Sequence, residues 1–344
     1  MINVADYAEA AAAKVDPQIW CYFEGGAGDE VTLRANVASY GRWRLRPRML
    51  VDVSEVSTRT TLLGTEVATP LGVAPFAMQR LLDPEGEAAT ARAAAAAGVL
   101  MTVSTLTTAR HEEIAEASSG PRWFQLYVLR DRARTLEHIA IARETGYSAV
   151  VLTVDLPYVG RRERDLRLGF ENPPRDLDLP YAALFDTTPT LTWRDLEWIR
   201  SESELPLVVK GVLTREDAEL AVEHGADAVW VSNHGGRQLD GVAASLDALP
   251  EVVDAVAGRC EVYLDGGIRR GIDVVKALAL GARAAFAGRP FAFGLAVDGG
   301  AGVASVLELL RAEIELALGL LGCTSPAAVA RSHVEPTVPY DPGT

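Results

Sequence analysis

Eight short runs of apolar residues follow one another along the chain from about residue 70, and they set the expected architecture. Continuous apolar runs of this length are typical of strands that are buried on both faces, as in a parallel sheet. The runs are Leu71–Ala74, Val99–Val103, Trp123–Val128, Ala149–Val154, Leu207–Val209, Ala228–Val231, Val262–Leu264 and Ala284–Ala287.

Alanine-rich segments with helical periodicity lie between these runs. Two of these helices are preceded by capping signals, Thr214-Arg-Glu-Asp217 and Thr192-Trp-Arg-Asp195. Glycines just beyond the last periodic residue indicate helix ends at Gly98, Gly146, Gly225 and Gly281. The predicted helices include Glu85–Ala97, Thr135–Thr145, Thr214–His224, Leu246–Val256 and Ile272–Leu280.

Eight strand–helix units over about 220 residues predict an α/β fold, the (β/α)8 TIM barrel, whose usual size is about 250 residues. A doubly wound open sheet is the alternative. Such a sheet normally carries a Gly-x-Gly-x-x-Gly turn after its first strand, and the sequence has none there. We therefore place the barrel over residues 70–322.

The remaining segments are assigned to the same single domain, 1–344, because no linker rich in Gly, Ser or Pro divides the chain. Residues 1–69 are predicted to form a helical lead-in with a short hairpin or cap, and residues 323–344 a C-terminal tail. One long connection, 163–200, follows the fourth strand. It contains four prolines, so we expect it to be irregular, and a connection of this length is usually a functional lid or a mobile segment.

Composition and charge narrow the function classes. The net charge of −14 repels nucleic acid and anionic membranes, so an anionic substrate needs a local group of Arg or Lys. Three scattered cysteines and five histidines show neither a disulfide framework nor metal-ligand spacing. The N-terminus lacks a signal-peptide pattern. The most apolar helical segment, 303–321, carries charged residues and is expected to face the core. We expect a cytoplasmic protein without a metal.

Two strand ends predict a phosphate site. Asp265-Gly-Gly-Ile-Arg-Arg270 and Ala287-Gly-Arg-Pro290 follow the last two strands, where barrels often bind phosphate. Glycines let backbone N–H groups approach an anion, and Arg269 or Arg289 can add paired hydrogen bonds. Simple turns are the structural alternative. The pattern alone does not distinguish a phosphorylated substrate from a cofactor.

Lys210 ends the fifth predicted strand, and His234 follows the sixth. Lys210 could bind an anion, form a Schiff base or extend to solvent. His234 precedes two glycines that leave space for a ligand, and we interpret it as a general base. Asp155 could fix its tautomer, and Arg237 could bind a carboxylate.

The chain resembles the FMN-dependent 2-hydroxy-acid oxidase and dehydrogenase family, which includes glycolate oxidase, lactate oxidase and mandelate dehydrogenase. The most specific segment is Ser232-Asn-His-Gly-Gly-Arg-Gln-Leu-Asp240, in its order relative to Lys210 and Asp265. The resemblance covers nearly the whole chain. Other segments that carry it include Tyr22-Phe-Glu-Gly-Gly-Ala-Gly-Asp29, Ala74-Pro-Phe-Ala-Met78, Phe124-Gln-Leu-Tyr127, Thr153-Val-Asp155 and Gly288-Arg-Pro290.

This resemblance implies roles for the matching residues. His234 would be the base, held by Asp155, while Arg162 and Arg237 would bind the substrate carboxylate with help from Tyr22 and Tyr127. Spacing alone favours a solvated pair for Arg161 and Arg162, so the resemblance changes the interpretation of Arg162 only. Lys210 would stabilise the reduced flavin. FMN would be bound by Pro75, Phe76, Ala77, Ser104, Gln125, Thr153, Lys210, Ser232, Asp265, Gly266, Gly267, Arg269, Gly288 and Arg289.

Two positions indicate the substrate and the electron acceptor. Leu106 stands where short-chain glycolate oxidases carry Trp, and a smaller residue should open the pocket. The segments 104–107 and 123–127 look similar to those of 4-hydroxymandelate oxidases, so mandelate or 4-hydroxymandelate in the (S) form is the expected substrate. Ala77 stands where several dehydrogenases carry Gly, which favours O2 as acceptor and H2O2 as product. The resemblance also suggests a homotetramer or higher homo-oligomer.

Four alternatives stay open at this point. The first is a dehydrogenase that passes electrons to a quinone or another carrier. The second is an oxidase of aliphatic acids of the lactate or glycolate type. The third is a phosphate-binding aldolase or isomerase in which Lys210 forms a Schiff base, and the fourth is a non-catalytic flavoprotein.

Overall fold

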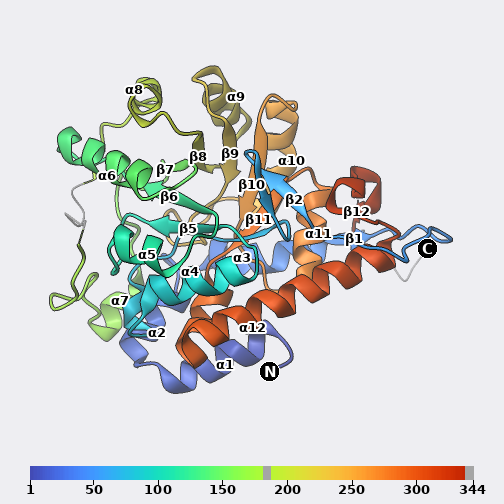
Figure 1. Cartoon of the computed structure of the whole chain (residues 1–344), viewed down its shortest axis with the longest axis horizontal. Coiled ribbons are helices and arrows are strands. Elements are labelled where there is room, and N and C mark those ends of the chain that lie inside the picture. The colour runs from blue at the N-terminus through green and yellow to red at the C-terminus, as the bar shows by residue number, and fades with distance from the viewer. Residues whose placement is uncertain (181–186, 338–344) are drawn as a thin grey trace.

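The computed structural model describes residues 1–180 and 187–337, and eight parallel strands in it close into a barrel (Figure 1). Strands that follow one another in sequence pair in space, and β11 pairs with β4 to close the ring. The predicted barrel is confirmed, and the doubly wound sheet is wrong. The barrel strands are β4 (Leu71–Val73), β5 (Met101–Ser104), β6 (Arg122–Leu126), β7 (Val150–Thr153), β8 (Leu207–Val212), β9 (Ala228–Val231), β10 (Glu261–Asp265) and β11 (Ala284–Ala287).

Helices cover the outside of the barrel, and the predicted capping signals are present. The side chain of Thr214 accepts a hydrogen bond from the backbone N–H of Asp217 at 3.2 Å, and Thr192 and Asp195 form a capping box. The glycines expected at helix ends adopt positive φ, which disfavours any other residue. These helices are α4 (Gly86–Ala96), α5 (His111–Ala117), α6 (Arg132–Glu144), α8 (Trp193–Ser203), α9 (Arg215–Glu223), α10 (Ser245–Val256) and α11 (Gly271–Ala279).

The longest helix, α12 (Arg289–Leu321), runs beside α1 and α4 along one side of the barrel (Figure 1). Non-helical backbone angles at Asp298 and Gly299 divide it into two parts. Among the described residues it is the one helix long and apolar enough to cross a membrane. Half of its most apolar window is buried against the rest of the protein, which agrees with the expected core-facing helix.

The lead-in contains three helices and a hairpin, as predicted. The helices are α1 (Val4–Lys14), α2 (Pro17–Glu24) and α3 (Val31–Ser39), and the hairpin pairs β2 (Thr60–Leu62) with β3 (Thr65–Val67). One pairing was not predicted. β1 (Trp43–Leu45) pairs antiparallel with β12 (Val334–Pro336), so the C-terminal tail returns to the lead-in.

The long connection after β7 is only partly irregular, which corrects the prediction for 163–200. Its first residues form α7 (Glu163–Leu168), and its last residues belong to α8. The irregular structure predicted from the prolines is confirmed for the described residues between these helices. Their one β-contact is an isolated bridge from Thr187 to Leu129, which follows β6. Residues 181–186 of the proposed lid and residues 338–344 of the tail lie outside the described residues.

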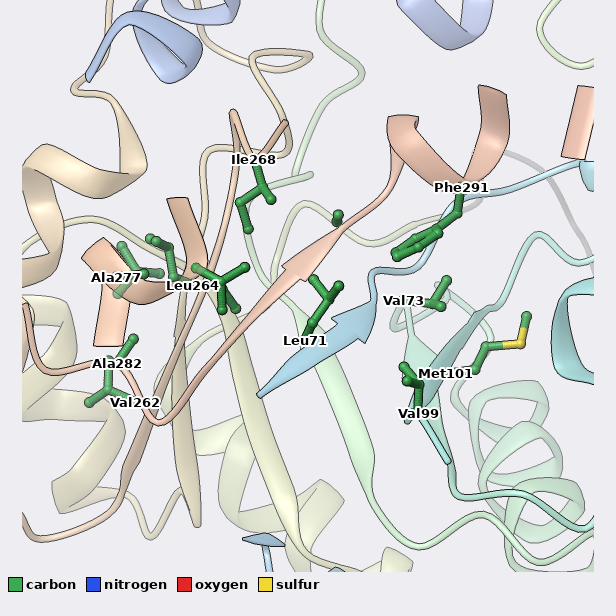
Figure 2. Packing of buried hydrophobic residues seen from close by; sticks show 14 of the residues in the cluster. Leu71, Val73, Val99, Met101, Val262, Leu264, Ile268, Ala277, Ala282 and Phe291 are labelled. Carbon is green, nitrogen blue, oxygen red and sulfur yellow. The ribbon is translucent and has the colours of Figure 1, made fainter. Parts of the chain in front are cut away.

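Buried residues form two layers separated by the barrel wall. Contacting aromatic rings fill the inside of the barrel below the carboxyl ends of its strands. They belong to Trp123, Trp230, Tyr263 and Phe286. Outside it, alternate strand residues pack against the helices. Figure 2 shows this outer layer, in which Leu71, Val73, Val262 and Leu264 lie near Ile268, Ala277 and Phe291. Side chains on a strand alternate between its two faces, so each strand contributes to both layers.

His111 is a polar residue inside the outer layer. Its side chain is almost completely buried, its Nδ1 lies 2.8 Å from the hydroxyl of Tyr147, and its ring meets the edge of Phe124. Burial and the neighbouring His138 lower the pKa of His111 to about 3. The folded protein therefore keeps this imidazole neutral at pH values where an unfolded chain would protonate it.

We predict that His111 makes the protein less stable as the pH falls from about 6.5 towards 3. In this window the unfolded chain binds a proton that the folded chain does not, which lowers the free energy of unfolding by up to about 1.4 kcal/mol per pH unit. Urea unfolding at pH 7, 6 and 5 should show a shallower dependence in a His111→Gln variant than in the wild type. Equal slopes would contradict the prediction, since all other titrating groups are shared.

Candidate active site

A layer of polar side chains lies at the carboxyl ends of the barrel strands. Gln125, Thr153, Lys210 and Asp265 end β6, β7, β8 and β10 or lie near their ends, and all four are buried. They follow inward-facing apolar residues two positions earlier on the same strands, so they also point inward. Together they line the floor of one cavity at this end of the barrel.

Almost every residue predicted for the site lines this cavity. Asp155 and Ser232 do not line it, but both bind side chains that do. The predicted residues on its wall are Tyr22, Pro75, Phe76, Ala77, Ser104, Leu106, Gln125, Tyr127, Thr153, Arg162, Lys210, His234, Arg237, Asp265, Gly266, Gly267, Arg269, Gly288 and Arg289. The empty space, counted to the open mouth, is about 1410 Å³.

His234 lies on the turn after β9 with its backbone in the left-handed region, at φ 59°. Its backbone N–H donates to Ser232 Oγ at 3.0 Å, and its Nδ1 lies 2.8 Å from Oδ1 of Asp155. Burial lowers the pKa of His234, helped by Lys210 and Arg162 and opposed by Asp155. Burial raises the pKa of Asp155, but the interaction with His234 outweighs it and the net shift is downward. The pair therefore holds a neutral imidazole beside an ionised carboxylate.

Lys210 belongs to a buried network at the cavity floor. Its Nζ donates to Ser232 Oγ at 2.8 Å and lies 3.2 Å from Oδ2 of Asp265, while Ser232 Oγ donates to Oδ1 of Asp265 at 2.7 Å. The carboxylate of Asp265 compensates the buried ammonium group. This network fixes the direction of Lys210 and also supports the turn that carries His234.

Two arginines flank the cavity near His234. Arg162 is buried, and its guanidinium lies 5.7 Å from the ring centre of Tyr22, while that of Arg237 lies 4.7 Å from the same ring. Burial and repulsion by Arg162 lower the pKa of Arg237 to about 10. Arg161 is 77% exposed at its side chain and contacts Glu163. The structure thus separates the two neighbouring arginines as the resemblance implied.

The predicted phosphate turn after β10 requires its glycine. Gly267 has φ 82°, and a Cβ atom there would lie 2.0 Å from the backbone oxygen of Asn36 on α3. Gly266 has φ 101° and also faces Asn36. The lead-in helix therefore packs directly on this turn, and the turn presents backbone to the cavity beside Arg269.

Arg289, which was predicted to bind a phosphate, also makes contacts that were not predicted. Its guanidinium donates to the backbone oxygens of Phe23, Glu24, Gly25 and Gly235 at 2.7 to 3.1 Å. Burial, with Arg237 and Arg269, lowers its pKa well below the usual range. The side chain of Arg289 thus ties the end of α2 to the site. Its backbone N–H begins α12, where helix geometry suits an anion.

Several polar atoms at or next to the cavity are buried and have no hydrogen-bond partner among residues 1–180 and 187–337. They are Gln125 Nε2, Thr153 Oγ1, Arg162 Nε and Asp155 Oδ2. Buried polar groups in native proteins are nearly always paired, so such a group indicates a ligand or water that completes it. Their grouping around one cavity indicates a polar ligand.

The sequence analysis did not identify several apolar and polar residues that also line the cavity. Leu129 follows β6, Leu156 and Val159 follow Asp155, and Asn172 and Thr187 lie in the long connection. Their nearness to strand ends was a signal for the first three. The long connection has no periodicity, so nothing in its sequence indicated Asn172 or Thr187.

Comparison with known proteins supports the predicted family. The profile described as FMN-dependent dehydrogenase matches residues 11–336. An L-lactate oxidase of Nostoc sp. (strain PCC 7120 / SAG 25.82 / UTEX 2576) is 50% identical, with 94% of this chain and 95% of the relative covered. Glycolate oxidase 1 of Oryza sativa subsp. indica is 46% identical, with 96% and 95% covered. A structure of mandelate oxidase with benzoyl-formic acid has a TM-score of 0.93 and 45% identity, with 98% and 99% covered.

The residues present fit FMN. Positive-φ glycines and the start of α12 suit a phosphate. Lys210, Gln125 and Thr153 offer buried polar groups on the wall of the same cavity. The hypotheses of a Schiff-base aldolase and of a non-catalytic flavoprotein are wrong, and the resemblance to the 2-hydroxy-acid oxidase and dehydrogenase family is confirmed. This chain belongs to the FMN-dependent dehydrogenase family and is an oxidoreductase that uses FMN.

Proposed function

We propose that the protein oxidises an aromatic (S)-2-hydroxy acid, such as mandelate or 4-hydroxymandelate, to the 2-oxo acid and reduces O2 to H2O2. One observation carries the proposal. A histidine held by a partly buried carboxylate shares a cavity with two buried or partly buried arginines, above a floor that suits FMN. Oxidation of a hydroxy acid needs all three: the histidine to take a proton, the arginines to bind the carboxylate and FMN to accept the electrons.

His234 acts as the base in this proposal. An ionised Asp155 can only accept a hydrogen bond, so Nδ1 of His234 donates to it and Nε2 keeps a lone pair. The lowered pKa of His234 keeps the imidazole neutral at pH 7. Nε2 can then take either the α-proton or the hydroxyl proton, and Asp155 stabilises the imidazolium that forms.

Arg162 and Arg237 bind the substrate carboxylate. Their mutual repulsion is reduced when an anion lies between them, and Nε of Arg162 lacks a partner until then. Burial raises the pKa of Tyr127, so its hydroxyl stays protonated and can donate to the same anion. Tyr22 supports both guanidiniums with its ring.

Bound FMN supplies the two-electron redox chemistry. Gly267, Arg269, Gly288 and the backbone N–H of Arg289 would hold its phosphate, and Lys210 would face its ring. The remaining contacts would come from Pro75, Phe76, Ala77, Ser104, Gln125, Thr153, Ser232, Asp265 and Gly266.

Two lines of support favour an aromatic substrate over an aliphatic one. Leu106, Leu129 and Leu156 line the same cavity as the arginines and offer apolar surface for a ring. Structures of mandelate oxidase with (S)-mandelic acid and with benzoyl-formic acid share the fold at a TM-score of 0.93. The alternative of an aliphatic substrate is supported by the L-lactate oxidase of Nostoc, at 50% identity.

The proposed acceptor is supported by the relatives and by the residue at position 77. The relatives named here are oxidases, and Ala77 lines the cavity beside Phe76, as the sequence-based choice of O2 requires. A quinone or another carrier is the alternative acceptor. The cytoplasmic location and the homotetramer or higher oligomer stay predictions.

We predict that replacing His234 removes catalysis and leaves the cofactor bound. A His234→Gln variant loses the base, so kcat should fall by roughly 10²–10⁴-fold while the protein keeps its flavin absorbance. His224→Gln is the matched control, because His224 pairs with Glu197 and neither residue lines the cavity. Retention of most of the activity in His234→Gln would show that another group is the base.

The pH profile should report the lowered pKa of His234. Because the neutral imidazole is the active form, kcat/KM should be flat at neutral pH and fall about tenfold per unit below a pKa lower than the ordinary value of about 6.5. Steady-state rates from pH 4.5 to 8.5 test this. An acid limb with a pKa above 7 would contradict it.

The residue at position 106 should control substrate choice. In air the wild type should show a higher kcat/KM for mandelate than for lactate or glycolate and form one H2O2 per turnover. Leu106→Trp should fill the pocket and lower kcat/KM for mandelate at least about tenfold relative to glycolate. Higher wild-type efficiency on glycolate would exclude the aromatic substrate, and turnover with a quinone but without H2O2 would exclude O2.

A further inference from the structure

Glu87 is a buried carboxylate that lies outside the cavity, in the first turn of α4. Its exposed fraction is 1%. Oε1 accepts hydrogen bonds from the backbone N–H groups of Gln79 at 3.2 Å and Thr108 at 3.0 Å. Oε2 accepts from the hydroxyl of Thr108 at 2.6 Å and from the backbone N–H of Ala109 at 3.2 Å. All four donors are neutral groups.

These donors come from two separate segments that both lead into the cavity. The first, 74–80, follows β4 and carries Phe76 and Ala77, and the second, 104–109, follows β5 and carries Leu106. The segments also bind each other directly, since the backbone N–H of Met78 donates to the backbone oxygen of Leu106 at 3.1 Å. Arg80 adds bonds to the hydroxyl and the backbone oxygen of Thr108, at 3.1 and 2.7 Å.

A buried charge needs all of its hydrogen bonds, and this determines what the carboxylate does. Moving it out of water is costly unless donors replace the lost water, and bonds to an ionised acceptor are stronger than neutral ones. The four donors satisfy Glu87 only while the segments keep one relative position. The carboxylate therefore resists any change in the spacing between 79 and 108.

We propose that Glu87 is a positioning residue that sets Leu106 against Ala77 and thereby controls which 2-hydroxy acids the cavity accepts. It touches neither the cavity nor the reacting atoms, and acts only through the two segments. This inference rests on the proposed function for its substrate part. Its structural part, the linkage of the two segments, does not.

A purely stabilising role for Glu87 makes different predictions. An acidic residue in the first turn of a helix stabilises that helix, and its loss would then lower stability without changing selectivity. The positioning role instead predicts local loosening of 74–80 and 104–109 together. It also predicts that the ratio of kcat/KM between a large and a small substrate changes.

The test compares FMN-loaded wild type, Glu87→Gln and Glu85→Gln. Glu85 is the matched control, because its exposed carboxylate lies at the start of the same helix and pairs with Arg92, which belongs to neither segment. Glu87→Asp is a second variant that keeps the charge and shortens the reach, in case Glu87→Gln does not fold. Hydrogen exchange is measured by peptide, and kcat/KM is measured on mandelate and glycolate.

Glu87→Gln should show faster exchange in both segments, retained flavin absorbance and a change of about tenfold or more in the mandelate-to-glycolate ratio. Glu85→Gln should match the wild type in both readouts, and Glu87→Asp should fall between the wild type and Glu87→Gln. Unchanged exchange in the two segments would overturn the linkage, and an unchanged ratio would overturn the control of selectivity. If the wild type oxidises neither acid, the proposed function fails, while the exchange data still decide the linkage.

Discussion

The site depends on the closed barrel, inside which the inward-facing residues change from aromatic and apolar to polar near the carboxyl ends of the strands. Strand side chains alternate between the helices and the barrel interior, and closure leaves the inward residues no route to bulk water except at the two ends. In the lower level these residues are Trp123, Trp230, Tyr263 and Phe286, which exclude water. In the level above, polar groups replace them, and a polar group there must be satisfied by its neighbours or by a ligand. Lys210 and Asp265 satisfy each other, whereas Gln125 Nε2 and Thr153 Oγ1 have no partner in the part of the chain that the structure describes.

Charge in the cavity opposes the charge of the whole molecule. The chain carries a net charge of −14, yet Arg162, Arg237, Arg269 and Arg289 line one cavity with Lys210. The lowered pKa values of Arg237 and Arg289 record the cost of burying these cations together. Backbone oxygens at the end of α2 offset part of this cost, and anions bound in the cavity would offset more. The acidic surface does not attract an anionic substrate, so local geometry must select it.

The sequence predicted those parts of the molecule that local rules determine. Strands buried on both faces read as apolar runs, and Thr214, Thr192 and the terminal glycines mark helix ends through bonds made within a few residues. The contact of Asp155 with His234 was predicted, but other contacts between distant segments were not. They include the pairing of β1 with β12, the packing of Asn36 on Gly267, and the donation from Arg289 to the backbone of Phe23 and Glu24. A backbone oxygen that accepts from a distant arginine leaves no trace in the identity of its own residue, so the use of Arg289 as a tether could not be inferred.

The same distinction separates the two halves of the site. The cofactor side consists of strand ends and glycine turns, whose positions follow from the barrel and whose residue types are restricted by its geometry. The proposed substrate side includes Leu106, Leu129, Leu156, Asn172 and Thr187, which line the cavity from connections of different length and conformation. Their positions depend on contacts outside the cavity, such as the four bonds that Glu87 accepts from the segments around Ala77 and Leu106. Substrate selectivity in this barrel can therefore change through residues that never touch the substrate, while the strand ends that suit FMN stay the same.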